Sequence, residues 1–248
     1  MAILKKKTKK RKSSHVEGHM VGRKGAIRAG VLGANDGVVS IGALIMGIVA
    51  ANQSLSTVVL TGASALAAGA GSMALGEYVS VASQKDVEQA DIARETAELE
   101  EDPEDELAEL AGIYRNRGLS EELAMKVAIE LTEHDVLDAH LRDELGINEH
   151  DRARPMQAAY VSFVAFCLGG ILPFLVGLFA TNVMTNSVTA RLTAVGLVSV
   201  VALSILGTTG AKLGGAPVKN ALIRVVGGGI AALVVTTVLG SAIGNSGL

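Results

Sequence analysis

Five long apolar stretches dominate the pattern of hydrophobic and polar positions, at residues 26–50, 55–83, 156–181, 187–211 and 219–243. The hydrocarbon core of a bilayer is about 30 Å thick, and a helix rising about 1.5 Å per residue crosses it with roughly 20 residues. Each stretch reaches that length, and the many glycines suit closely packed helices better than a barrel. The expected fold class is therefore all-α, an integral membrane protein with five transmembrane helices.

The segment between the second and third apolar stretches is acidic. All but three of the 25 acidic residues lie within residues 84–155; the exceptions are Glu17, Asp36 and Glu77. No helix breaker follows the second stretch, so its helix is expected to continue to Glu101. A second helix should begin at Pro103, which suits a first helical position, and a third should run from Ser120 to Leu145. The pattern thus predicts an acidic three-helix unit.

Lysine and arginine residues set the expected orientation. They are dense within residues 5–12 and recur at Lys212 and Lys219, after the fourth stretch. The positive-inside rule then predicts a cytosolic N-terminus and a cytosolic acidic unit. The predicted organisation is a basic cytosolic arm (1–25), two membrane helices (26–83), the acidic unit (84–155) and three membrane helices (156–248). The lysine cluster lacks accompanying aromatic residues, so we expect it to meet lipid headgroups and not nucleic acid.

Asp36 lies within the first apolar stretch, about ten residues and hence roughly 15 Å from its cytosolic end. A carboxylate at mid-bilayer costs several kcal/mol unless it is paired, protonated or bound to a metal, which favours a functional site inside the bundle. The alternative is a helix cap at a local break, because Asn35, Asp36 and Gly37 are good turn residues.

One face of the second predicted helix carries Ala65, Gly69, Met73 and Glu77 at intervals of four. A thioether together with carboxylates is a mixed ligand set that suits a transition-metal ion better than magnesium or calcium. The alternatives are a packed methionine and an interfacial carboxylate near the cytosolic end.

The acidic unit offers further ligand pairs at helical spacing. They are Asp91, Glu95, Glu98 and Asp102, then Glu106 and Glu109, and finally His140 and Glu144. Carboxylates brought together across antiparallel helices raise one another's pKa unless a divalent cation neutralises them, as in di-iron carboxylate bundles. The alternative is a solvated acidic face.

Several other classes find no support in the sequence. The single cysteine, Cys167, excludes an internal disulfide, no histidine lies in the membrane stretches, and no nucleophile-elbow or phosphate-binding glycine motif occurs. We therefore expect no resident cofactor, no enzymatic activity and no ATP-driven transport.

Residues 33–40 (GANDGVVS), 68–84 (AGAGSMALGEYVSVASQ) and 144–147 (ELGI) resemble the vacuolar iron transporter family. The resemblance spans nearly the whole chain after Arg23. It implies a homodimer with the translocation path between subunits, a cytosolic metal-binding unit and proton-coupled export of ferrous iron. By motif, Asp36 and Met73 look like pathway ligands with Glu77 beside them, and the cytosolic cluster looks like Glu95, Glu98, Glu106, Glu109 and Glu144.

His140 stands where members of that family can have methionine, which hardens the metal site and affects selection among iron, manganese, cobalt and zinc. The expected location is the plasma membrane in a prokaryote or the vacuolar membrane in a eukaryote. We thus expect a ferrous-iron exporter working by proton antiport. Two alternatives are a membrane-anchored di-iron ferroxidase and a metal sensor or buffer.

Overall fold

The computed structural model describes residues 24–147, 153–184 and 186–246, and these residues form α-helices without any strand. Nearly all of the predicted N-terminal arm (1–25) lies outside the described residues. The helices are α1 (Lys24–Ala50), α2 (Leu55–Glu101), α3 (Pro103–Asn116), α4 (Glu121–Asp143), α5 (Pro155–Val183), α6 (Val188–Leu213) and α7 (Val218–Asn245).

Five of these helices, α1, α2, α5, α6 and α7, are long and apolar enough to cross a membrane. Their ends lie within two residues of the predicted spans, apart from the end of α2, which continues to Glu101 as predicted. Large apolar side chains such as Leu60, Phe179 and Leu197 are more than half exposed, as expected for surfaces that face lipid. The predicted all-α class is confirmed, and each of the five predicted spans forms a helix long and apolar enough to cross a membrane.

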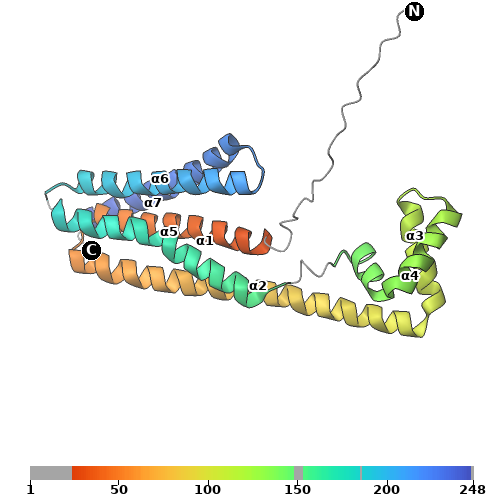
Figure 1. Cartoon of the computed structure of the whole chain (residues 1–248). Coiled ribbons are helices and arrows are strands. Elements are labelled where there is room, and N and C mark those ends of the chain that lie inside the picture. Colours follow the sequence, from red (N-terminus) through yellow and green to blue (C-terminus); the bar gives the residue numbers. More distant parts are fainter. Residues whose placement is uncertain (1–23, 148–152, 185, 247–248) are drawn as a thin grey trace, which may run out of the picture.

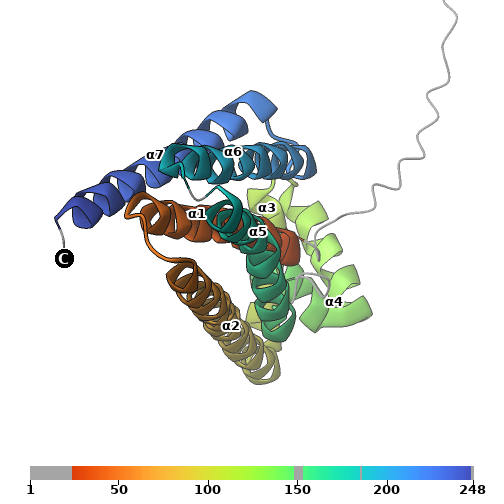
Figure 2. The same ribbon diagram turned by 90° about the vertical axis from the view of Figure 1, so that its left-hand side faces the viewer.

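The membrane-spanning bundle is built around α1. This helix packs against α2, α5, α6 and α7, and Figure 2 shows it between α2 and α5 on one side and α6 and α7 on the other. Its Val38, Ile41 and Ile45 are fully buried. Helix α1, which carries Asp36, is therefore the shared core element of the bundle.

Two close backbone approaches explain glycines on α1 and α7. A Cβ atom on Gly37 would overlap the carbonyl oxygen of Phe166 in α5, and one on Gly240 would overlap the carbonyl oxygen of Gly47 in α1. Small residues at such crossings let helix backbones approach and pack tightly in lipid. Gly37 therefore sets the spacing of α1 and α5 beside Asp36, and Gly240 sets the spacing of α1 and α7.

The second half of α2 leaves the bundle and carries α3 and α4 (Figure 1). Helices α3 and α4 share a small core that includes Leu110, Ala128 and Ala139, and both helices also contact α2. Ser120 caps α4 as predicted, its hydroxyl accepting a hydrogen bond from the amide of Leu123. Helix α4 ends at Asp143, two residues before the predicted Leu145, and Gly146 follows with φ of +67°. The long α2 therefore holds the acidic helices apart from the membrane spans.

Replacing Gly240 by alanine should destabilise the bundle by about 1–3 kcal/mol, because the added methyl group meets the backbone of α1. Gly228 in the same helix is the matched control, since a Cβ there meets nothing within 4 Å. Gly228→Ala should leave the midpoint of thermal unfolding unchanged or slightly raised, as alanine favours helices. Circular dichroism of the detergent-solubilised variants measures both midpoints, and equal shifts would contradict the packing account.

Candidate functional site

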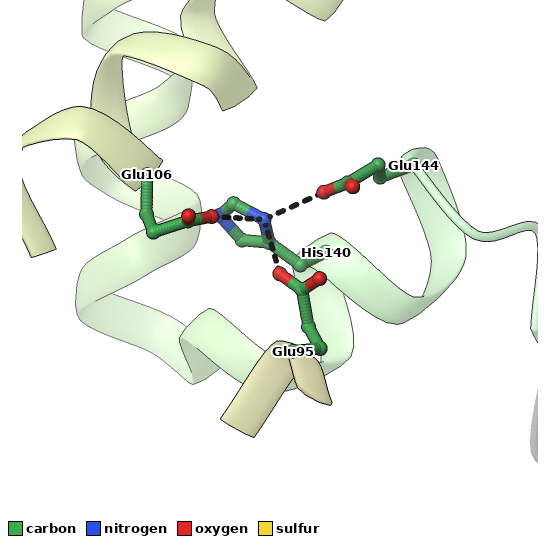
Figure 3. Close-up of side chains that lie close together, drawn as sticks. All are labelled: Glu95, Glu106, His140 and Glu144. Atoms are coloured by element: carbon green, nitrogen blue, oxygen red, sulfur yellow. Dashed lines mark hydrogen bonds and ion pairs between the residues drawn. The ribbon is translucent and has the colours of Figure 1, made fainter. Parts of the chain in front are cut away.

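Three carboxylates converge on one nitrogen of His140 (Figure 3). The Nδ1 atom lies 2.8 Å from Glu95 Oε1, 3.1 Å from Glu144 Oε2 and 3.6 Å from Glu106 Oε2. One ligand atom from each of these four residues lies within 4.8 Å of all the others. The described residues thus contain a compact group of three oxygens and one nitrogen, which we call the His140 cluster.

Each helix of the acidic region contributes to the His140 cluster. Glu95 comes from α2, Glu106 from α3, and His140 and Glu144 lie one turn apart at the end of α4. Helix α4 breaks at Asp135, where φ of −164° and ψ of 97° are not helical. The Asp135 carboxylate accepts a hydrogen bond from the amide of Asp138 and so starts the helix again. The last two turns of α4, which carry His140, therefore lie beyond a kink and run in a different direction from the first part of the helix.

His140 cannot donate a hydrogen bond to all three carboxylates at once. A ring nitrogen carries at most one proton, yet three carboxylates surround Nδ1. The contact with Glu144 has hydrogen-bond geometry, whereas Glu95 Oε1 is buried and accepts no hydrogen bond from the described residues despite its short distance to Nδ1. Carboxylate oxygens with one imidazole are a donor set suited to divalent manganese, iron or zinc.

Burial and the repulsion between neighbouring carboxylates disfavour the charged forms of Glu95 and Glu106. Burial raises the pKa of Glu95, Glu144 raises it further, and His140 partly offsets this. Burial also raises the pKa of Glu106, with Glu109 as the next contribution. A divalent cation would remove both penalties by supplying positive charge at the point where the oxygens meet.

Four other acidic residues predicted for this region lie outside the His140 cluster. Glu98 and Glu109 have exposed side chains, although both raise the pKa of Glu106. Asp91 pairs with Arg94 at 3.2 Å, and Asp102 occupies the junction between α2 and α3. The structure therefore brings together Glu95, Glu106, His140 and Glu144, and leaves the others at its edge.

A polar latch beside the His140 cluster was not predicted from the sequence. Asp143 accepts hydrogen bonds from Tyr114 at 2.7 Å, Arg117 at 2.6 Å and Arg142 at 3.0 Å. Burial acts to raise the pKa of Asp143, but the hydrogen bonds from Arg117, Tyr114 and Arg142 together lower it. The latch joins α3 to the end of α4 and so positions the neighbouring Glu144.

A second group of predicted residues lies within the membrane-spanning helices. Asp36 of α1 and Met73 of α2 line one pocket of about 420 Å³, together with Ser40, Ser72 and Phe166. The Ser40 hydroxyl donates a hydrogen bond of 2.8 Å to Asp36 Oδ1, a contact that the sequence analysis missed although the two residues are one turn apart. A carboxylate, hydroxyls and a thioether therefore share one open pocket between the membrane-spanning helices.

Glu77 lies one turn beyond Met73 on α2, outside the lining of this pocket. Its carboxylate is 14% exposed and lies 3.6 Å from the guanidinium of Arg28, near the start of α1. Glu77 thus stands between the pocket and the part of α2 that leads to the His140 cluster.

The sequence model of the VIT family matches residues 27–241. A vacuolar iron transporter from Acanthamoeba castellanii is 44% identical over 223 residues, which cover 89% of this chain and 79% of the relative. The chain belongs to the VIT family. A vacuolar iron transporter from Toxoplasma gondii is 36% identical, with 89% and 75% covered, and vacuolar iron transporter homolog 2.1 from Arabidopsis thaliana is 32% identical, with 90% and 83% covered.

Neutralising Glu95 in this VIT-family chain should lower the affinity for Mn²⁺ at least about tenfold, because a ligand to a cation contributes at least roughly 1.4 kcal/mol. The exposed Glu100 on the same helix is the matched control. Isothermal titration calorimetry of the Glu95→Gln and Glu100→Gln variants with Mn²⁺ measures both affinities. Equal affinities in the two variants would show that the His140 cluster does not bind the ion.

The raised pKa values of Glu95 and Glu106 predict how the metal-free VIT-family protein responds to pH. A carboxyl whose folded-state pKa exceeds its unfolded value contributes stability below the ordinary value of about 4.5 and loses it as pH rises through the folded pKa. Thermal unfolding of metal-free protein should therefore show stability falling as pH rises above about 4.5. The double variant Glu95→Gln, Glu106→Gln should lose this part of the pH dependence of stability. An unchanged pH profile would show that these two carboxyls do not cause it.

Proposed function

We propose that this protein moves divalent metal, ferrous iron first, out of the cytosol across its membrane in exchange for protons. The observation that carries this proposal is the pocket shared by Asp36 and Met73 inside the membrane-spanning helices. The naming of its relatives as iron transporters supports it. A sensor, a buffer or a ferroxidase would not require a carboxylate and a thioether in the spans.

In this proposal the His140 cluster captures the metal before transport. Its four side chains offer one nitrogen and three carboxylate oxygens, and Glu98 and Glu109 add negative charge at its edge. Acidic surroundings raise the local concentration of cations. The imidazole of His140 suits Fe²⁺, Mn²⁺, Co²⁺ and Zn²⁺ alike. Selection among these ions therefore also depends on the pocket of Asp36 and Met73.

The ion then passes to Glu77 and on to the pocket of Asp36 and Met73. Arg28 lies 3.6 Å from Glu77, so an arriving cation competes with the guanidinium for this carboxylate. Asp36 supplies charge and Met73 a soft sulfur ligand, which magnesium and calcium do not favour. Protonation of the carboxylates after release couples the return of H⁺ to metal export.

We further propose a homodimer with a cytosolic N-terminus and a cytosolic acidic unit (84–155). Few side chains of the membrane-spanning part of α2 are buried, and the pocket of Asp36 opens beside this helix, so a second copy has an apolar face to cover there. The names of the relatives support a vacuolar membrane if the source is a eukaryote, and the plasma membrane is the counterpart in a prokaryote.

Replacing Asp36 by asparagine should reduce Fe²⁺ flux at least about tenfold, because the neutral amide removes the charge that stabilises the ion.

Met73→Leu should reduce the preference for Fe²⁺ over Mn²⁺, since the sulfur ligand is lost. Met46→Leu is the matched control, as Met46 packs against the same core but lies outside the pocket lining.

The measurement is anaerobic Fe²⁺ entry into proteoliposomes with an imposed pH gradient, with internal pH recorded in parallel. Undiminished, proton-dependent flux in Asp36→Asn would refute the proposed pathway. Binding without entry in the unaltered protein would favour a sensor or buffer, and O₂ consumption on iron addition would favour a ferroxidase.

A further inference from the structure

A second polar pocket lies at the end of the bundle remote from α3 and α4. The connections between α1 and α2 and between α5 and α6 meet at this end (Figure 1). The pocket has a volume of about 340 Å³ and is lined by Asn52, Gln53, Ser54, Leu55, Thr181, Asn182 and Arg191. Neither the transport pathway nor the His140 cluster uses these residues.

Among the described residues that line this pocket, Arg191 alone is charged, and it is 6% exposed. Its Nε donates a hydrogen bond of 3.1 Å to the carbonyl oxygen of Met184, and one of its terminal nitrogens donates at 3.2 Å to Asn52 Oδ1. These two acceptors are neutral, and Arg191 makes a further contact besides them. In the sequence, residues 37–76 and 156–248 contain no aspartate or glutamate. A buried guanidinium in such surroundings favours an anion from outside the chain.

The remaining features of the pocket also favour negative charge. The hydroxyl oxygen of Thr181 is buried and has no hydrogen-bond partner among the described residues. Helices α2 and α6 both begin here, after Ser54 and Ser187, and helix N-termini attract anions through their free amides. Asn182 and Gln53 also line the pocket with side-chain amides, and the Gln53 amide donates one hydrogen bond to the carbonyl oxygen of Ala51.

We propose that this pocket binds a phosphate group. The guanidinium provides the charge and a planar set of donors, the Thr181 hydroxyl and the amides provide further hydrogen bonds, and no lining carboxylate opposes the anion. The pocket lies where the helices end, at headgroup depth for a chain that spans a bilayer. The phosphate can therefore come from a phospholipid headgroup or from free inorganic phosphate. Both sources bind through the same chemistry.

The test uses the full-length protein in detergent with two probes. Inorganic phosphate is compared with chloride at equal ionic strength by the midpoint of thermal unfolding, and retention of phosphatidylglycerol is measured by native mass spectrometry. Arg191→Gln removes the charge, and Thr181→Val removes one hydroxyl at nearly constant volume. Lys212→Gln, which removes an exposed cation at the opposite end of α6, is the matched control.

Thr181→Val should weaken binding roughly fivefold, the loss expected for one hydrogen bond, and Arg191→Gln should abolish it. Stabilisation by phosphate that depends on Arg191 and Thr181 supports a free-phosphate site. Lipid retention that depends on them, without a phosphate effect, supports a headgroup site. The proposal is overturned if the unaltered protein responds to neither probe, or if Thr181→Val and Lys212→Gln behave alike. The Thr181 variant keeps the test valid even if Arg191→Gln does not fold.

Discussion

Three carboxylates around a single imidazole nitrogen are the constraint on which the acidic region depends. One proton on Nδ1 can satisfy one of them, so the remaining carboxylates repel each other around a buried imidazole. The protein holds this unfavourable group together by other means. The long α2 presents Glu95, the core around Leu110 joins α3 to α4, and the Asp143 latch fixes the end of α4. Such a preorganised group of oxygens suits a divalent cation.

The membrane-spanning part solves a related problem with different residues. A carboxylate within lipid needs a polar neighbour and a defined cavity, and Asp36 has both in Ser40 and the pocket shared with Met73. The glycines of α1 and α7 let the backbones pack closely, and residues of α1, α2 and α5 line the pocket that contains Asp36 and Met73. The two ligand groups are thus connected by one continuous helix, since Met73, Glu77 and Glu95 all lie on α2.

Length and apolar content were enough to predict the five spans, because a bilayer sets a minimum length for a helix. Ser120, Pro103 and Gly146 marked the helix ends of the acidic region through local rules that do not depend on the fold. The break at Asp135 was missed, although the spacing of Asp135 and Asp138 is a typical helix-start signal.

Contacts between residues far apart in the sequence could not be predicted from the sequence alone. Tyr114 and Arg117 meet Asp143 only because α3 and α4 fold back on each other, and the pattern of charges alone does not reveal such a pairing. In the same way, helical spacing made Glu98 and Glu109 as good candidates as Glu95 and Glu106. The rotation of each helix about its own axis, which the packing of α2, α3 and α4 sets, decides which carboxylates point toward His140.

The most direct test of the central claim is the position of a bound metal. Crystals of the full-length protein grown with Mn²⁺ and measured for anomalous scattering would locate the ion. We predict a peak within coordination distance of Glu95, Glu106, Glu144 and Nδ1 of His140, and its loss in His140→Phe. An ordered ion elsewhere in the acidic region, with the His140 cluster unchanged, would contradict the account.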